Sequence, residues 1–298
     1  MKRYFHGESK KGPYFEGWYF KCQTKDGKAI ALIPAFHIDS GNRRSASLQV
    51  ITGSGTWWLD YRAEAFSASQ AQLRIQVGSS AFSETGISLK IETPELSLHG
   101  RLKFGAFLPL KSDIMGPFRF LSNMECVHGV ISMRHSLQGT LSLNGELLDF
   151  TGGTGYIETD RGRTFPSAYL WTQCAWPCGS MMLSVAAIPL AGIRLTGCIC
   201  ALIHNGKEYR LATYRRVRIQ RWSDGGALIR QGKYRLEVAL LEEQPQPLRA
   251  PVNGVMGRTI HESLCAKMRC RFWVGDALLF DQTDCTGSFE YSNPDCES

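Results

Sequence analysis

Two short stretches of the sequence place acidic side chains among aromatic residues. The first, YFEGWYFKC, sets Glu16 between Phe15 and Trp18, and the second, GYIETDRG, contains Glu158 and Asp160. A carboxyl group in apolar surroundings resists ionisation and can stay protonated near neutral pH. Such a group can donate a proton to a substrate, and ring faces can stabilise the cation that forms. Both stretches are therefore candidates for acid catalysis.

Alternation along a strand indicates which of these side chains can act together, because successive residues point to opposite faces. In the first stretch it puts Glu16 on one face with Trp18 and Phe20. A buried ion pair is the alternative explanation for Glu16. For Asp160 the alternative is a turn, since TDRG lets the aspartate hydrogen-bond its own backbone.

The second stretch continues into YLWTQCAW, where alternation puts Trp171 and Gln173 on one face of a strand. By the same rule Tyr156 shares the face of Glu158. An amide such as that of Gln173 could orient a polar head group. His37 follows the apolar run ALIPAF and could face a cavity. The other histidines show no metal-ligand spacing and are interpreted as surface or core residues.

Several enzyme classes lack their motifs in this sequence. It contains no G-x-S-x-G elbow and no phosphate-binding loop, and GGTG lacks the third glycine and the helix of a dinucleotide fold. The ten cysteines include no C-x-x-C pair, which favours free thiols in a reducing compartment over a zinc site. We expect neither a metal nor a redox cofactor.

The composition indicates a chain that can bury a large core without disulfide bonds. It has 298 residues, of which 43% are hydrophobic. The N-terminal stretch MKRYFHGESKKGPYF lacks the apolar run of a secretory signal. The longest apolar stretch, 181–193, is interrupted by a serine and a proline and is shorter than the roughly 20 residues that span a bilayer. We therefore expect a cytoplasmic protein, and a peripheral membrane contact is also compatible with the sequence.

The formal net charge of +7 is concentrated most densely in YRRVRIQRW, residues 214–222. Charge on an exposed edge strand blocks unwanted strand pairing. The same pattern would suit a membrane-facing patch or, with its interleaved rings, a nucleic-acid site. The edge strand is the favoured interpretation, and we do not expect nucleic acid as a partner.

Periodicity predicts an all-β protein. Short runs rich in β-branched and aromatic residues alternate with glycine-bearing turns, as in AIALIPAFHI and SASLQVITG. The turns TKDGK, LNGE and HNGK place Asp-Gly or Asn-Gly between two such runs, which is a strong hairpin signal. Hairpins at this spacing are typical of antiparallel barrels or sandwiches. The double glycine in DFTGGTGY suggests a division into residues 1–152 and 153–298.

Four sequence blocks resemble the tocopherol cyclase family. They are YFEGWYFK at 14–21, GYIETDRGRTFP at 155–166, YLWTQCAW at 169–176 and PLRAP at 247–251. They occur in the family's order and cover nearly the whole chain. The resemblance implies a calycin-like fold, with two lipocalin-like antiparallel β-barrel halves packed together.

The resemblance also implies a reaction, the cyclisation of a prenylated benzoquinol to a chromanol. An alkene is protonated and the phenol oxygen captures the tertiary cation, without a cofactor. Glu16 or Glu158 would donate the proton, with Asp160 as a third candidate. The expected partner is a hydrophobic small molecule, a prenylated quinol or another isoprenoid. The residues expected to line its pocket are Trp18, Phe20, His37, Tyr156 and Trp171, with Gln173 at the head group.

Two other functions remain open from the sequence. Asp160 and Arg161 stand where plant members of the family carry asparagine and tryptophan, which leaves the substrate undetermined. A related calycin-like family hydrates isoprenoid double bonds, using the same protonation with water as the nucleophile. A barrel of this kind could also bind a hydrophobic ligand and leave it unchanged.

Overall fold

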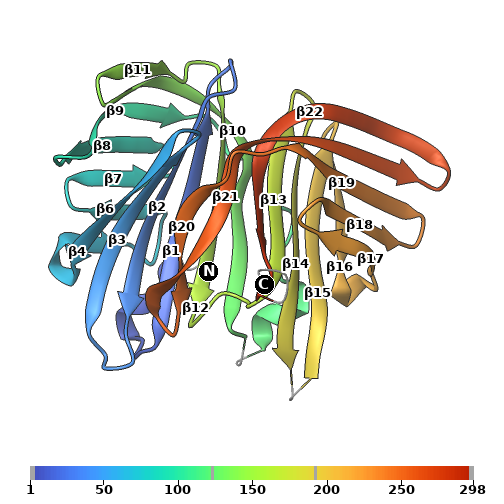
Figure 1. Ribbon diagram of the computed structural model, residues 1–298, viewed down its shortest axis with the longest axis horizontal. Helices are drawn as coiled ribbons and strands as arrows, with labels where there is room; N and C mark the ends of the chain where they lie inside the picture. Colours follow the sequence, from blue (N-terminus) through green and yellow to red (C-terminus); the bar gives the residue numbers. More distant parts are fainter. Residues whose placement is uncertain (1–3, 122–123, 191–192, 295–298) are drawn as a thin grey trace. The chain divides into compact units, whose positions relative to one another are not determined.

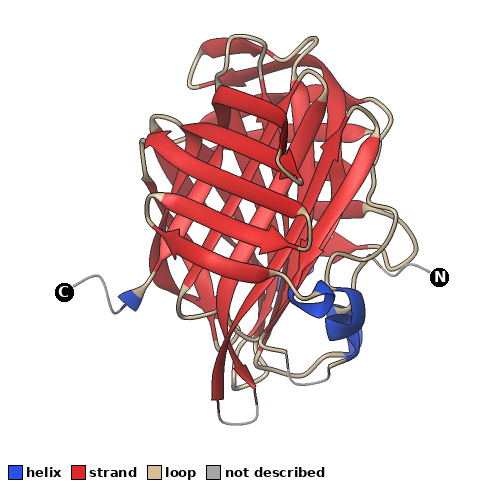
Figure 2. Cartoon of the chain, turned by 90° about the vertical axis from the view of Figure 1, so that its right-hand side faces the viewer, coloured by secondary structure: helices blue, strands red, loops and turns tan. Residues whose placement is uncertain are grey.

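The computed structural model describes residues 4–121, 124–190 and 193–294, and strands make up most of these ranges (Figure 2). Two antiparallel sheets, of twelve and ten strands within the described residues, contain them. The prediction of an all-β chain built from antiparallel sheets is confirmed. None of the described helical segments is long and apolar enough to cross a bilayer. These 3₁₀ segments are η1 Gly7–Ser9, η2 Ala63–Ala65, η3 Gly116–Phe120 and η4 Thr213–Arg215.

The first sheet has the strand order β4-β3-β2-β1-β12-β10-β9-β8-β7-β6-β5, with β11 paired to β10 (Figure 1). Most neighbours are joined by tight hairpins, whereas β12 returns to pair with both β1 and β10. The strands are β1 Tyr14–Gln23, β2 Ala29–Ile38, β3 Arg44–Thr52, β4 Gly55–Arg62, β5 Phe66–Ala68, β6 Arg74–Val77, β7 Ser80–Ser83, β8 Gly86–Glu92, β9 Ser97–Phe104, β10 Cys126–Leu143, β11 Glu146–Asp149 and β12 Thr154–Gly162.

The second sheet has the order β16-β15-β14-β13-β22-β21-β19-β18-β17, with β20 paired to β21. Its strands are β13 Tyr169–Trp176, β14 Gly179–Leu190, β15 Ile193–His204, β16 Lys207–Ala212, β17 Arg218–Ser223, β18 Gly226–Gln231, β19 Tyr234–Glu242, β20 Gln246–Val252, β21 Val255–Val274 and β22 Ala277–Ser292. The arginine-rich run ends in β17, which is an edge strand, so the edge interpretation of that run is confirmed.

The chain divides into two compact units, each with a core of its own. Unit 1 comprises residues 1–109, 125–165 and 248–258, and unit 2 comprises the remaining ranges. The double glycine that suggested a division after residue 152 is a turn inside the first sheet. Gly152 has φ +76°, and the N–H of Gly153 donates to the carbonyl of Phe150. The strand that follows, β12, belongs to the first sheet, so the main division falls after Phe165.

Alternation places the core of unit 1 on one side of β1. Trp18, Phe20 and Cys22 are buried in that core with Ile30 and Leu32 from β2. The odd-numbered residues of β1 therefore point to the opposite face of the sheet. Tyr156 and Glu158 of β12 are paired with odd-numbered residues of β1 and lie on that second face.

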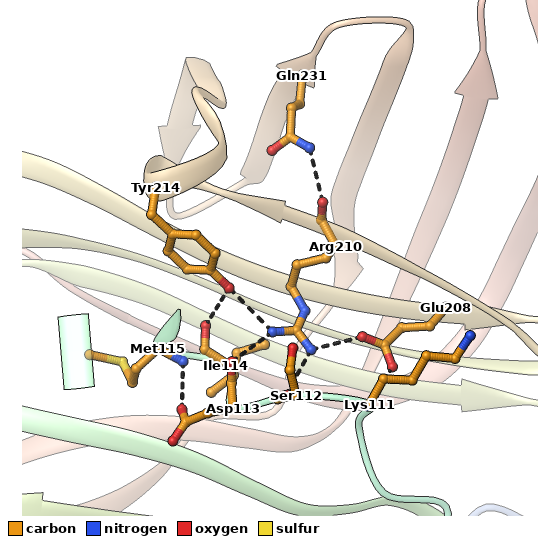
Figure 3. A network of polar contacts seen from close by, with 9 residues as sticks. All are labelled: Lys111, Ser112, Asp113, Ile114, Met115, Glu208, Arg210, Tyr214 and Gln231. Atoms are coloured by element: carbon orange, nitrogen blue, oxygen red, sulfur yellow. Dashed lines mark hydrogen bonds and ion pairs between the residues drawn. The ribbon is translucent and has the colours of Figure 1, made fainter. Parts of the chain in front are cut away.

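In unit 2 a side chain joins the two ends of the sheet. The Gln231 amide at the end of β18 donates to the carbonyl of Arg210 and accepts from the N–H of Ala212, both at 3.0 Å. The buried Arg210 guanidinium donates to the carbonyls of Ser112 and Asp113 and to the carboxylate of Glu208 (Figure 3). These contacts fasten the segment before η3 to β16.

Candidate active site

Glu158 lies in the middle of β12 and retains only 4% of its accessible surface. The hydroxyl of Tyr156, two residues earlier on the same face, donates a hydrogen bond to Oε2 of Glu158. Ile157, between them, belongs to the core of unit 1, so both side chains point away from that core. The structure therefore places Tyr156 and Glu158 on one face of β12, as alternation predicted.

The neighbouring strand, β10, supplies a histidine to this site. His128 stands opposite Asp160 in the β10–β12 register. Its Nδ1 lies 3.0 Å from Oδ1 of Asp160, and its Nε2 lies 3.4 Å from Oε2 of Glu158. The thiol of Cys126, also on β10, lies 3.4 Å from the same Asp160 oxygen. One imidazole thus contacts two carboxyl groups.

Burial and neighbouring charges shift the pKa values of His128 and Glu158 in opposite directions. Burial alone would lower the pKa of His128, but the charges of Asp160 and Glu158 outweigh it and hold that pKa well above 6.5. Burial raises the pKa of Glu158 above 4.5, and the His128 charge opposes this shift only in part. Burial also raises the pKa of the Tyr156 phenol. The favoured state is an imidazolium–aspartate ion pair beside a glutamic acid that holds its proton more firmly than an exposed one.

The same three residues could hold a divalent metal ion, since ligand atoms of His128, Glu158 and Asp160 all lie within 4.8 Å of one another. In a metal site one ring nitrogen and the carboxylate oxygens converge on a single point. Here the two carboxyl groups contact different ring nitrogens of His128. The ion pair alone accounts for this geometry.

Glu16 is also buried but has a different set of partners. Its Oε2 accepts hydrogen bonds from the backbone N–H groups of His6, at 2.8 Å, and Gly7, at 3.1 Å, and from the Tyr14 hydroxyl at 2.8 Å. Its Oε1 lies 2.8 Å from Nδ1 of His6. Since η1 begins at Gly7, this carboxylate anchors the N-terminal turn on β1. A structural role accounts for its burial.

Strand register separates Glu16 from Glu158. β1 and β12 pair without a register shift, with Glu158 opposite Tyr19 and Glu16 opposite Arg161. Cross-strand partners share a face of the sheet, whereas residues three apart on one strand do not. The two candidate acids therefore point to opposite faces.

The predicted lining residues of unit 1 divide between these two faces. Trp18 and Phe20 are packed in the core, on the Glu16 face. His37 of β2 is paired in register with Phe15, which places it on the face of Glu158. The Nε2 of His37 lies 2.8 Å from Oγ of Ser47.

The other two lining residues, Trp171 and Gln173, belong to β13 of unit 2 and are buried. The core of unit 2 takes the alternate positions of this strand, so both side chains face away from it. Trp171 is paired in register with Glu290 of β22, whose Oε1 accepts a hydrogen bond from the Tyr169 hydroxyl. A buried phenol–carboxyl pair thus occurs in each unit.

His128 is the main site residue that the sequence analysis missed. No ligand-like spacing surrounds it in the sequence. His128 and Asp160 are 32 positions apart and meet only because β10 pairs with β12. No local pattern in the sequence carries that information.

Solved structures share the fold of this chain, although no protein-family model and no curated protein matches it. The crystal structure of kievitone hydratase from Nectria haematococca gives a TM-score of 0.56 at 10% identity, covering 98% of this chain and 93% of that one. A protein from Nitrosomonas europaea described as an AttH gives a TM-score of 0.56 at 14% identity, covering 93% of this chain and 92% of that one. These likenesses show a common fold, and membership of the tocopherol cyclase family stays a prediction.

Proposed function

We propose that this protein is a cofactor-independent enzyme that protonates a carbon–carbon double bond in a hydrophobic, isoprenoid-like substrate, with Glu158 as the acid. The observation that carries the proposal is the environment of Glu158. Its carboxyl group is buried, its pKa is raised by that burial, and it lies beside the ion pair of His128 and Asp160. A perturbed carboxyl with defined charge partners is typical of a catalytic site.

The chemistry that suits this site begins with proton transfer from Glu158 to one carbon of a trisubstituted alkene. The π electrons form the new C–H bond and leave a tertiary cation on the other carbon. An oxygen nucleophile then bonds to the cation, and its O–H proton returns to Glu158. A phenol of the same molecule gives a chromanol of unchanged mass, whereas water gives a tertiary alcohol that is heavier by one water.

Tyr156 and His128 act on the carboxylate that the first step creates. Once Glu158 has lost its proton, the phenol hydrogen bond and the imidazolium charge both stabilise the anion, which makes donation easier. Asp160 keeps His128 charged by raising the pKa of the imidazole. In this scheme Glu158 contacts the substrate, and His128 and Asp160 determine the electrostatic environment of Glu158.

Two independent likenesses support this class of reaction. The sequence blocks resemble a family that cyclises prenylated quinols, and a solved protein with the same fold is named for a hydration. Cyclisation and hydration share the protonation step and differ in the oxygen that captures the cation.

The test is incubation of the purified protein with a prenylated hydroquinone, followed by liquid chromatography and mass spectrometry. A product of equal mass and changed retention indicates cyclisation, and a product heavier by one water indicates hydration. Glu158→Gln removes the transferable proton and preserves the shape, so we expect turnover to fall by about 100-fold or more. Unaltered substrate recovered with the wild-type protein would instead favour a non-catalytic carrier.

The matched control is Glu146→Gln, the same change at an exposed glutamate of unit 1 that pairs with Lys28 at 2.7 Å. This variant should keep full activity. If Glu158→Gln also keeps full activity, Glu158 is not the acid and the proposal fails.

A further inference from the structure

A second polar cluster lies on the same face of the first sheet as Glu158. His37 is 5% exposed, and its Nδ1 has no hydrogen-bond partner among the described residues. The indole Nε1 of Trp58 on β4 is likewise buried without a partner there. The rings of His37 and Trp58 are 6.5 Å apart between centroids. Because buried polar groups are nearly always hydrogen-bonded, two such groups side by side point to a bound partner.

The surroundings of this pair are held in place by β20. Gln49 accepts a hydrogen bond from the N–H of Arg249 at 2.9 Å and donates to its carbonyl at 3.0 Å. The Arg249 guanidinium carbon lies 4.8 Å from the centre of the Trp58 ring. Ser47 fixes the other nitrogen of His37 at 2.8 Å. These contacts hold the side chains of His37 and Trp58 in place, so the positions of the two open groups, His37 Nδ1 and Trp58 Nε1, are fixed.

The open groups suit an uncharged hydroxyl. Burial lowers the pKa of His37 to about 4, so its imidazole is neutral near pH 7 and offers one N–H and one lone pair. Trp58 offers only an N–H donor. Asp60, opposite Ser47 in the register, and the Arg249 guanidinium beside Trp58 bring opposite charges to this pair. With the ring proton on Nε2 beside Ser47, a phenol or alcohol can accept from the indole N–H and donate to the lone pair of Nδ1.

Between this cluster and the acid the sheet surface carries its smallest side chains. Asp160 is paired in register with Gly17, and Gly17 is paired with Ala35. Gly17 keeps accessible surface, whereas every other residue from 14 to 22 is buried. His37 on β2 is opposite Phe15 and Glu158 on β12 is opposite Tyr19, so they are two strand spacings apart across the sheet and four residues apart along it, about 17 Å in all. A ligand lying over Gly17 could therefore reach both clusters.

We propose that His37 and Trp58 bind the hydroxyl head group of the substrate whose double bond meets Glu158, an inference that rests on the proposed function. The substrate class is then a phenol or alcohol whose oxygen lies roughly 17 Å from the reacting double bond, as in a hydroxyl compound with a long isoprenoid chain. The small residues Gly17 and Ala35 lie between these ends.

Binding without turnover tests this inference. In the Glu158→Gln background, a prenylated hydroquinone and its dimethyl ether are titrated by isothermal calorimetry. We expect the hydroquinone to bind about tenfold or more tightly than the ether, because the ether cannot donate a hydrogen bond. His37→Leu should remove this preference, and His37→Gln, which keeps polar atoms, should restore part of it. The control His99→Gln changes an exposed histidine of unit 1 and should bind like the parent.

A second variant keeps the test decisive if His37→Leu does not fold. A Cβ at Gly17 would lie 3.4 Å from the Cβ of Ala35, an ordinary contact, so Gly17→Ala should fold and weaken both ligands by occupying their space. Equal affinity for hydroquinone and ether in the parent, or unchanged preference in His37→Leu, overturns the inference. Retained turnover in Glu158→Gln overturns the proposed function instead, so the two failures can be told apart.

Discussion

Glu16 and Glu158 lie on neighbouring strands of one antiparallel sheet and point to its opposite faces. The same residue type, equally buried, therefore serves two purposes. The contacts of Glu16 tie His6, Gly7 and Tyr14 to β1, whereas those of Glu158 set the proton affinity of a carboxyl group. The two roles predict different consequences for the same substitution.

Glu16→Gln should destabilise the fold and leave catalysis intact. Its new amide NH₂ would face N–H and O–H donors in place of a carboxylate oxygen, so we expect the free energy of unfolding to fall by about 1–3 kcal/mol. Urea unfolding measures the stability, and turnover per folded molecule measures the activity. A well-folded Glu16→Gln protein without turnover would contradict the division of roles.

The pH dependence of activity should report on His128. Activity requires protonated Glu158, so it should fall as pH rises through the pKa of this group, which lies above 4.5. The His128 charge lowers that pKa. His128→Gln should therefore move the alkaline limb of kcat/KM to higher pH, measured from about pH 4 to 9. His135→Gln, which changes a histidine without a carboxylate neighbour in its described contacts, serves as the control, and a shift to lower pH would contradict the scheme.

Local patterns in the sequence predicted a good part of this structure. Asn144–Gly145 and Asn205–Gly206 have positive φ and connect β10 to β11 and β15 to β16, as expected for Asn-Gly hairpins. Alternation within β12 placed Tyr156, Glu158 and Asp160 on one face, and they share it. Such features depend on neighbours in the sequence, which a single chain displays.

Features that depend on pairing between distant strands could not be predicted. The opposite orientation of Glu16 and Glu158 follows from the register of β1 with β12, whose partners are some 140 positions apart. His128 reaches Asp160 through the pairing of β10 with β12, which contains register shifts. The double glycine at 152–153 has the composition of a boundary, but its turn returns β12 to the first sheet because that strand completes the pairing of β1 and β10.

A buried histidine should make stability depend on pH. His135 is packed between Phe104 and Phe107, with ring centroids 4.6 and 4.9 Å away, and burial lowers its pKa to about 4. Between that value and the ordinary 6.5, the unfolded chain binds a proton that the folded chain does not. Stability therefore falls as pH falls through this window, by roughly 3 kcal/mol at most for this residue. His37 contributes in the same direction.

The measurement is urea unfolding of the wild-type protein and His135→Gln at several pH values within this window. The variant lacks the titrating group, so the difference in stability between the two proteins should shrink as the pH is lowered. Other groups titrate equally in both proteins and cancel. A constant difference across the window would show that the His135 proton affinity is not perturbed.

The Arg210 guanidinium in unit 2 is 3% exposed and should be sensitive to substitution (Figure 3). Arg210→Leu removes the cation that faces Glu208 at 2.8 Å and frees the carbonyls of Ser112 and Asp113, so we expect a loss of about 3–5 kcal/mol. Arg210→Lys should recover only part of this, because an ammonium cannot reproduce the planar fork that serves several acceptors.

Gln231→Leu isolates the link between the two ends of the second sheet. It keeps the volume of the side chain and removes its hydrogen bonds to Arg210 and Ala212, for an expected loss of about 1–3 kcal/mol in urea unfolding. Arg218→Leu on the exposed edge strand is the control, with a change within about 0.5 kcal/mol. If Gln231→Leu is as stable as this control, the amide only occupies the space between β16 and β18, and unit 2 holds its sheet ends together through its core.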